Sequence, residues 1–236
     1  TVAQSSKLPP SPEHPFGTDA TGRDQLVRVI YGSRVSLTVG VIATLISTGI
    51  GLVMGALAAF YGGWFDTIIM RLADMFLAIP YTLFVITMLA VMGQGIQNVF
   101  IAIGVLGWPS IARVFRSAIL SVKENDYVDA ARAMGASDLR IIARHIFPNS
   151  VASIVVYATM NIGGAILTES ALSYLGMGVT PPTPSWGIMI QDGQTFLQTQ
   201  PWLMIMPGLA ILSTVLAFTL LGDGLRDALD VKMKDA

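Results

Sequence analysis

The stretch from Val35 to Phe65 reads VSLTVGVIATLISTGIGLVMGALAAFYGGWF and contains no charged residue. Three further uncharged stretches follow, at residues 75–112, 146–168 and 193–222. An α-helix rises 1.5 Å per residue and the hydrocarbon layer of a bilayer is about 30 Å thick, so about 20 apolar residues cross it. Each stretch is therefore long enough for at least one membrane-spanning helix.

The composition of the 236-residue chain supports the same interpretation. Hydrophobic residues make up 53%, charged residues 12%, and the mean hydropathy is +0.65. A soluble domain carries about 25% charged residues and could not hide this much apolar surface from water. The absence of cysteine excludes a disulfide scaffold, and a net charge of −1 gives no sign of nucleic-acid binding. The sequence predicts an all-α, polytopic membrane helical bundle.

Five spans account for the four stretches, because the polar segment at residues 93–98 divides the second one. We place them at residues 36–60, 73–92, 98–118, 150–172 and 202–221, within a transmembrane core of residues 35–222. Pro80 should kink the second span. Arg113 and Arg116 should snorkel to the membrane face at the end of the third. Small residues four apart on the first span predict a helix-packing seam: Ala43, Ser47, Gly51, Gly55 and Ala59.

Basic residues orient the spans, because Lys and Arg gather in cytoplasmic loops. Segments 61–71, 113–148 and 222–236 carry one, six and three of them, whereas 92–98 and 173–202 carry none. This predicts a cytoplasmic loop at 119–149, a cytoplasmic tail at 223–236 and an external loop at 173–201. Residues 1–34 then lie outside the cell membrane, with an interfacial helix from Thr21 to Arg34. This topology predicts a sixth, upstream span in the full protein.

The cytoplasmic loop predicts two short helices that meet at a glycine. Asn125 or Asp126 can cap the first helix, Gly135 can end it, and a second helix can run from Ser137 to Pro148. Their small apolar residues suit the groove of another protein, whose acidic rim the neighbouring arginines could meet. An amphipathic hairpin lying on anionic lipid fits the same periodicity.

These residues also carry a motif. Asp129-Ala130-Ala131, three residues, Gly135, nine residues and His145-Ile146-Phe147-Pro148 resemble the EAA loop, a signature of the permease subunits of bacterial ATP-binding-cassette (ABC) importers. Asp129 stands where the general pattern has Glu, His145 where it has Ile, and Phe147 where it has Leu. Segments 14–24, 30–37, 63–74, 144–149, 175–187 and 220–227 resemble the dipeptide, oligopeptide and nickel branch of these importers, and the second of its two permeases.

The resemblance implies one half of a translocation pathway in the bacterial inner membrane. Its partners would be a second permease, two cytoplasmic ATPases that bind ATP and magnesium, an external substrate-binding protein and the lipid bilayer. The family places the short helix in a cleft of one ATPase. The residues implied in this coupling are Tyr127, Asp129, Ala130, Ala131, Arg132, Met134, Gly135, Ala136, His145 and Pro148.

Three further predictions concern the pathway and its outer mouth. Glu169 is a carboxylate inside an otherwise uncharged span, which favours a pathway or gate role. The alternative is a carboxylate solvated by Ser170, Ser173 and external water. Pro80 is a second pathway candidate, because transporters use proline kinks as hinges. The external loop should contact the binding protein, and its candidate residues are Pro181, Pro182 and Trp186.

No catalytic or metal-binding group is expected in this sequence, which contains no Gly-Lys-Ser or Gly-Lys-Thr phosphate loop. The substrate stays open. Peptides are favoured, and nickel or another solute is the alternative. A stand-alone channel or secondary transporter is the main rival from another class, and a membrane-embedded enzyme is a weaker one, because no paired carboxylates or nucleophile triad occurs.

Overall fold

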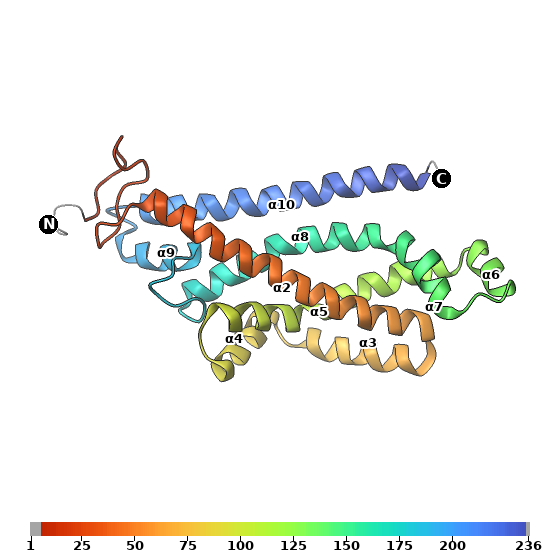
Figure 1. Ribbon diagram of the computed structural model, residues 1–236. Coiled ribbons are helices and arrows are strands. Elements are labelled where there is room, and N and C mark those ends of the chain that lie inside the picture. The colour runs from red at the N-terminus through yellow and green to blue at the C-terminus, as the bar shows by residue number, and fades with distance from the viewer. Residues whose placement is uncertain (1–5, 235–236) are drawn as a thin grey trace. The chain divides into compact units, whose positions relative to one another are not determined.

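The computed structural model describes residues 6–234, apart from the side chains of residues 138, 139 and 230–234. Within that range it contains helices, one isolated bridge between Thr18 and Asp24, and no strand (Figure 1). Residues 1–5 of the predicted external segment and residues 235–236 of the predicted tail lie outside the described residues. The helices are α2 (Gln25–Tyr61), α3 (Gly63–Ala78), α4 (Tyr81–Met92), α5 (Ile96–Lys123), α6 (Asp126–Ala133), α7 (Asp138–Ile141), the π-helical turn η1 (Ile142–Ile146), α8 (Phe147–Tyr174), α9 (Trp186–Gly193), the 3₁₀ turn η2 (Gln194–Phe196) and α10 (Trp202–Lys234).

Four candidate spans are long and apolar enough to cross a membrane, and α3 with α4 makes a fifth if the pair counts as one. This confirms the predicted helical membrane fold. The second span differs from a kinked helix, because α3 and α4 meet at 88°. Ile79 is extended, with φ −91° and ψ 132°, as expected of a residue whose helical conformation would clash with the following Pro80. Pro80 therefore breaks the span.

The predicted interfacial helix over 21–34 is not separate, since α2 runs from Gln25 to Tyr61 without interruption. Residues before it are held in turns by Asp19, whose Oδ1 accepts hydrogen bonds from the Thr21 amide, the Thr21 hydroxyl and the Arg23 amide at 2.8–2.9 Å. Asp24 Oδ1 accepts from the Val27 amide at 3.0 Å and so caps α2. These side-chain bonds delay the helix start.

The chain divides into two compact units, each of which contains parts of α2, α5, α8 and α10. The first unit holds the chain up to Ala43, Thr82–Ile103 and Ile162–Phe218. The second holds Thr44–Tyr81, Gly104–Asn161 and the chain from Thr219 onward. The core of the first unit gathers residues from α2, α8, α9 and α10, namely Val29, Ile166, Trp186, Met189 and Ile211.

The second unit contains four of the five residues of the predicted packing seam on α2, and the fifth, Ala43, is buried in the first unit. Its members Ser47, Gly51 and Gly55 are buried there, as is Ala59. The seam faces α5, since a Cβ placed on Gly51 would lie 2.7 Å from Ile111, and one on Gly55 would lie 2.7 Å from the Ala112 carbonyl oxygen. The small residues therefore allow the two helix backbones to approach closely, as predicted.

The two arginines of α5, predicted to snorkel at the membrane face, each have a carboxylate partner on α3. Arg116 forms a bidentate pair with Asp66 of α3, with both N–O distances at 2.5 Å. Arg113 pairs with Asp74, which also belongs to α3. Both carboxylates precede the proline break by at least one turn. A charge within a span is less costly when it is paired, so these contacts hold α3 against α5.

Candidate functional site

The hairpin of α6 and α7 (Figure 1) carries most of the residues predicted for coupling. All of it belongs to the second unit. α6 ends as predicted at Gly135, which has φ +80°. The Gly135 amide donates to the Arg132 carbonyl at 3.0 Å and the Ala136 amide donates to the Ala131 carbonyl at 3.1 Å. This pair of bonds is a Schellman motif, in which a left-handed glycine reverses the chain.

The start of α6 is only partly as predicted. Asn125 holds the N-cap position with extended backbone, but its side chain makes no cap bond to α6. Its Nδ2 donates instead to the carbonyls of Ser121 and Val122 at 3.2 and 3.0 Å. These carbonyls lie in the last turn of α5, where Val122 also accepts from the Asn125 amide at 3.1 Å, so Asn125 joins the end of one helix to the start of the next.

The inner face of the hairpin is packed against the second unit's long helices. Val128 and Ala131 of α6 are buried, with exposed fractions of 0% and 4%. They share one apolar cluster with residues from α2, α5, α7, η1 and α8, namely Ala59, Phe60, Phe115, Ile119, Val122, Ile141, Ile146 and Ile154. Lys123 Nζ also donates to the Ala59 and Phe60 carbonyls at 3.3 and 3.0 Å. The short helix is therefore fixed to the spans.

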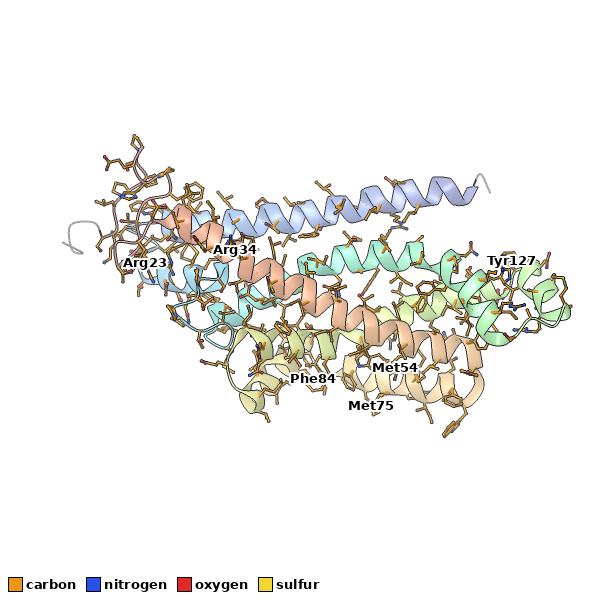
Figure 2. All side chains as sticks on the ribbon, viewed as in Figure 1. Arg23, Arg34, Met54, Met75, Phe84 and Tyr127 are labelled. Carbon is orange, nitrogen blue, oxygen red and sulfur yellow. The ribbon has the colours of Figure 1, made fainter. Side chains whose placement is uncertain are left out.

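The outer face of α6 is exposed and mixes small, apolar and charged residues. Tyr127, labelled in Figure 2, is 44% exposed and Met134 is 83% exposed. Asp129 and Arg132 are exposed and lie 3.7 Å apart, which is a loose surface pair. The remaining exposed members of the predicted set are Ala130, Gly135 and Pro148, while Ala136 and His145 are partly buried. This is a compact protruding surface with no covering partner among the described residues.

The predicted second helix does not end at Pro148. η1 makes one wide turn, in which the Phe147 amide donates to the Ile142 carbonyl, and α8 continues directly from Phe147. Proline has no amide hydrogen and its ring crowds the preceding turn, and a π-turn is one way for a helix to accommodate this. His145 lies in the wide turn with its ring centroid 6.2 Å from that of Tyr127. Tyr127 and His145, two members of the predicted coupling set from different elements, thus lie side by side.

Glu169 lies in the first unit with an exposed fraction of 0%. Its Oε1 accepts from the Ser173 hydroxyl at 2.7 Å, and its Oε2 accepts from the Ser36 hydroxyl at 2.9 Å and from Ser170 at 3.4 Å. Ser185 is a fourth hydrogen-bonding hydroxyl. We call these five residues the Glu169 cluster. Its pathway role stays a prediction.

The sequence indicated only part of this cluster. Ser170 and Ser173 follow Glu169 within about one helical turn, and the sequence predicts that they solvate it. Ser36 and Ser185 were missed, since Ser36 lies 133 positions away and belongs to α2. A serine in an apolar span does not indicate from the sequence alone which side chain it hydrogen-bonds. Only the packing of α2 against α8 reveals it.

The other predicted external and pathway residues are not members of the Glu169 cluster. Pro181 and Pro182 are exposed. Trp186 is 3% exposed, and its Nε1 donates to the Val29 carbonyl of α2 at 2.9 Å. It anchors the external loop instead of standing on its surface. Pro80 is exposed at the break between α3 and α4.

Comparisons with known proteins agree with this arrangement. The chain is 45% identical over 225 residues to the dipeptide transport system permease protein DppC of Alkalihalophilus pseudofirmus, covering 95% of this chain and 74% of that protein. It is 46% identical to the glutathione transport system permease protein GsiD of Pectobacterium atrosepticum, covering 95% and 75%. An inward-facing structure of the MetNI methionine ABC transporter shares the fold, with a TM-score of 0.72, 19% identity and coverage of 86% and 96%. Residues 49–235 match the family described as "Binding-protein-dependent transport system inner membrane component". The chain belongs to this family of transport-system membrane components.

Proposed function

We propose that this chain is one of two permease subunits of an ATP-driven importer and forms half of its translocation pathway. The family match and the relatives named as dipeptide and glutathione permeases support this function. The chain contributes no catalytic group in this proposal. ATP and magnesium bind to two ATPase subunits, which sit on the cytoplasmic side with the hairpin and the C-terminus.

Short peptides are the proposed substrates. A dipeptide and the tripeptide-like glutathione are both small molecules with a peptide backbone, and the permeases named for them are nearly equally similar to this chain. Selection among such peptides would rest largely on the external binding protein that delivers them. Nickel or another solute is the alternative, and no observation in the chain favours it.

The observation that carries the coupling proposal is that α6 is buried on one side and exposed on the other. Val128 and Ala131 fix one side of α6 to the spans, while Asp129 and Ala130 of the same helix and its C-cap residue Met134 are exposed. A helix held this way can transmit a displacement into the spans, because packed interiors shift as units and do not deform gradually. ATP-driven closure of the ATPases would then bias the permease between two arrangements.

A crosslinking experiment tests this docking. The chain contains no cysteine, so Met134→Cys gives one labelling position on it. A benzophenone attached there should crosslink to an ATPase subunit in the purified assembly. Val91→Cys is the matched control, because Val91 is 86% exposed on α4 and lies outside the hairpin. Crosslinks from position 134 to lipid alone, with no ATPase product, would refute the proposal and favour an amphipathic hairpin on the membrane.

A further inference from the structure

The members of the Glu169 cluster come from three parts of the chain, namely α2, α8 and the external loop. Ser36 comes from α2, Ser170 and Ser173 come from α8, and Ser185 precedes α9 inside the loop. Four hydroxyls surround one buried carboxylate, and the cluster lies within a single compact unit. The cluster therefore joins two candidate spans and the loop through one side chain.

The serines that hold Glu169 also hold the loop backbone. Ser173 Oγ accepts from the Val179 amide at 3.2 Å while it donates to Glu169. Ser185 Oγ accepts from the Ile188 amide at 3.3 Å and caps α9. A Cβ placed on Gly187 would lie 2.3 Å from the Ser170 carbonyl oxygen, so the start of α9 lies directly against α8. Moving Glu169 would disturb all three contacts.

We infer that Glu169 is a positioning residue, which fixes the external loop so that its outer surface is preformed for the substrate-binding protein. This inference rests on the proposed function. α9 buries Trp186, Ile188 and Met189 and leaves Gln191 and Asp192 exposed. Leu197, just after η2, is 50% exposed. The Glu169 cluster thus determines which loop residues face outward. A surface that is already ordered binds a partner at a smaller entropic cost.

The burial of Glu169 distinguishes this role from contact with the transported molecule. Both carboxylate oxygens already accept hydrogen bonds from serines, and the side chain has no exposed surface. A residue that contacts a passing peptide needs an accessible atom. A residue that positions a loop needs to be buried, because buried and fully hydrogen-bonded networks make a structure rigid.

The test uses the complete transport assembly in vesicles with its own peptide-loaded binding protein. Glu169→Gln retains the shape of the side chain but replaces one carboxylate oxygen with an amide donor that faces the serine hydroxyls. Ser36→Ala removes only the hydrogen bond from α2 to Glu169. Both should raise the concentration of binding protein that half-saturates ATP hydrolysis, by about 2- to 10-fold, as expected for one weakened hydrogen bond. The maximal rate and the rate without binding protein should stay unchanged. Thr168→Ala is the control, since the Thr168 hydroxyl bonds its own helix at the Gly164 carbonyl.

Hydrogen exchange supplies an independent readout. Amides of residues 177–190 should exchange faster in the Glu169→Gln assembly than in the Thr168→Ala assembly. An unchanged half-saturating concentration with unchanged exchange would overturn the inference. A lowered maximal transport rate with unchanged half-saturation would overturn it as well and place Glu169 in the pathway. If the unmodified assembly does not respond to any binding protein, the proposed function itself fails.

Discussion

Asp19 shows how one side chain can organise a segment outside the candidate spans. Burial acts to raise its pKa, but hydrogen bonds from the Arg23 backbone, the Thr21 and Arg23 side chains and the Thr21 backbone outweigh this and lower the pKa below the ordinary 3.8. Its Oδ2 also accepts from Arg28 Nη1 at 2.8 Å. The ionised carboxylate is therefore the form that the fold prefers.

A pH dependence follows for residues 7–24. Because the folded pKa of Asp19 is lowered, its contribution to stability is complete above about pH 4 and is lost as the pH falls through the folded value. Asp24, whose pKa is also lowered, adds in the same direction. Limited proteolysis of this segment should accelerate below about pH 4. Asp19→Asn should accelerate it already at pH 7, whereas exposed Glu13→Gln should not; equal cleavage of the two variants would contradict the assignment.

Single residues also mark the limit of what the sequence predicts. A charge in or beside an apolar stretch is conspicuous, so Glu169, Arg113 and Arg116 stand out in the sequence by themselves. Their partners do not. The sequence predicts that Arg116 snorkels to the membrane face, but it does not indicate that Asp66, 50 positions away, is its partner. Long-range pairing depends on which helices pack together, and a single sequence holds no direct record of that packing.

At the scale of elements, the α2–α5 seam predicts a sharp contrast between two glycines. A Cβ on Gly55 would lie 2.7 Å from the Ala112 carbonyl oxygen, so Gly55→Ala forces the backbones apart and should cost about 1–3 kcal/mol. Gly49 has no atom within 4 Å of its Cβ position, so Gly49→Ala on the same helix should be neutral or stabilising. Thermal unfolding in detergent measures both. Equal melting temperatures would argue against close packing at Gly55.

The turn at Gly135 gives a second prediction at this scale. Its φ of +80° is unfavourable for a β-branched residue by about 1–2 kcal/mol, although the space around it is open. Gly135→Val should therefore distort the end of α6 and uncouple ATP hydrolysis from transport while the protein still inserts. Gly135→Asn should preserve coupling, because asparagine tolerates this conformation. The ratio of peptide transported to ATP hydrolysed measures the effect, and an unchanged ratio in the valine variant would contradict the role of the turn.

Elements were predictable where one residue dictates the local backbone. The end of α6 was predictable because the left-handed conformation of Gly135 depends on the glycine itself and not on contacts with distant residues. Pro80 and Pro148 show why the same reasoning is incomplete, since one proline breaks a span by 88° and the other lies near the start of a continuing helix. The difference lies in the preceding residues. Ile79 is extended, whereas residues 142–146 widen into a π-turn that accepts the ring.

At the scale of the whole chain, uncharged stretches predict the number of candidate spans, because the bilayer fixes their length and composition. The orientation of the spans and the assembly partners have a different physical basis. The orientation depends on how the chain inserts into the membrane. The choice of partners depends on the surfaces that contact other subunits. Their strongest support is the match of residues 49–235 to a family of transport-system membrane components.

Transport in vesicles separates the importer from a stand-alone channel or secondary transporter. We expect that a labelled dipeptide does not cross the membrane of vesicles that contain this chain alone, with or without an ion gradient. In the proposed function this chain supplies only half of the pathway, and without an ATPase bound to α6 nothing drives the pathway to open. Vesicles with both permeases, the ATPases, the binding protein and ATP should accumulate the dipeptide against its gradient. Gly135→Val in that assembly should still hydrolyse ATP but accumulate less. Dipeptide flux through the chain alone would instead establish a channel, and gradient-driven uptake without ATPases would establish a secondary transporter.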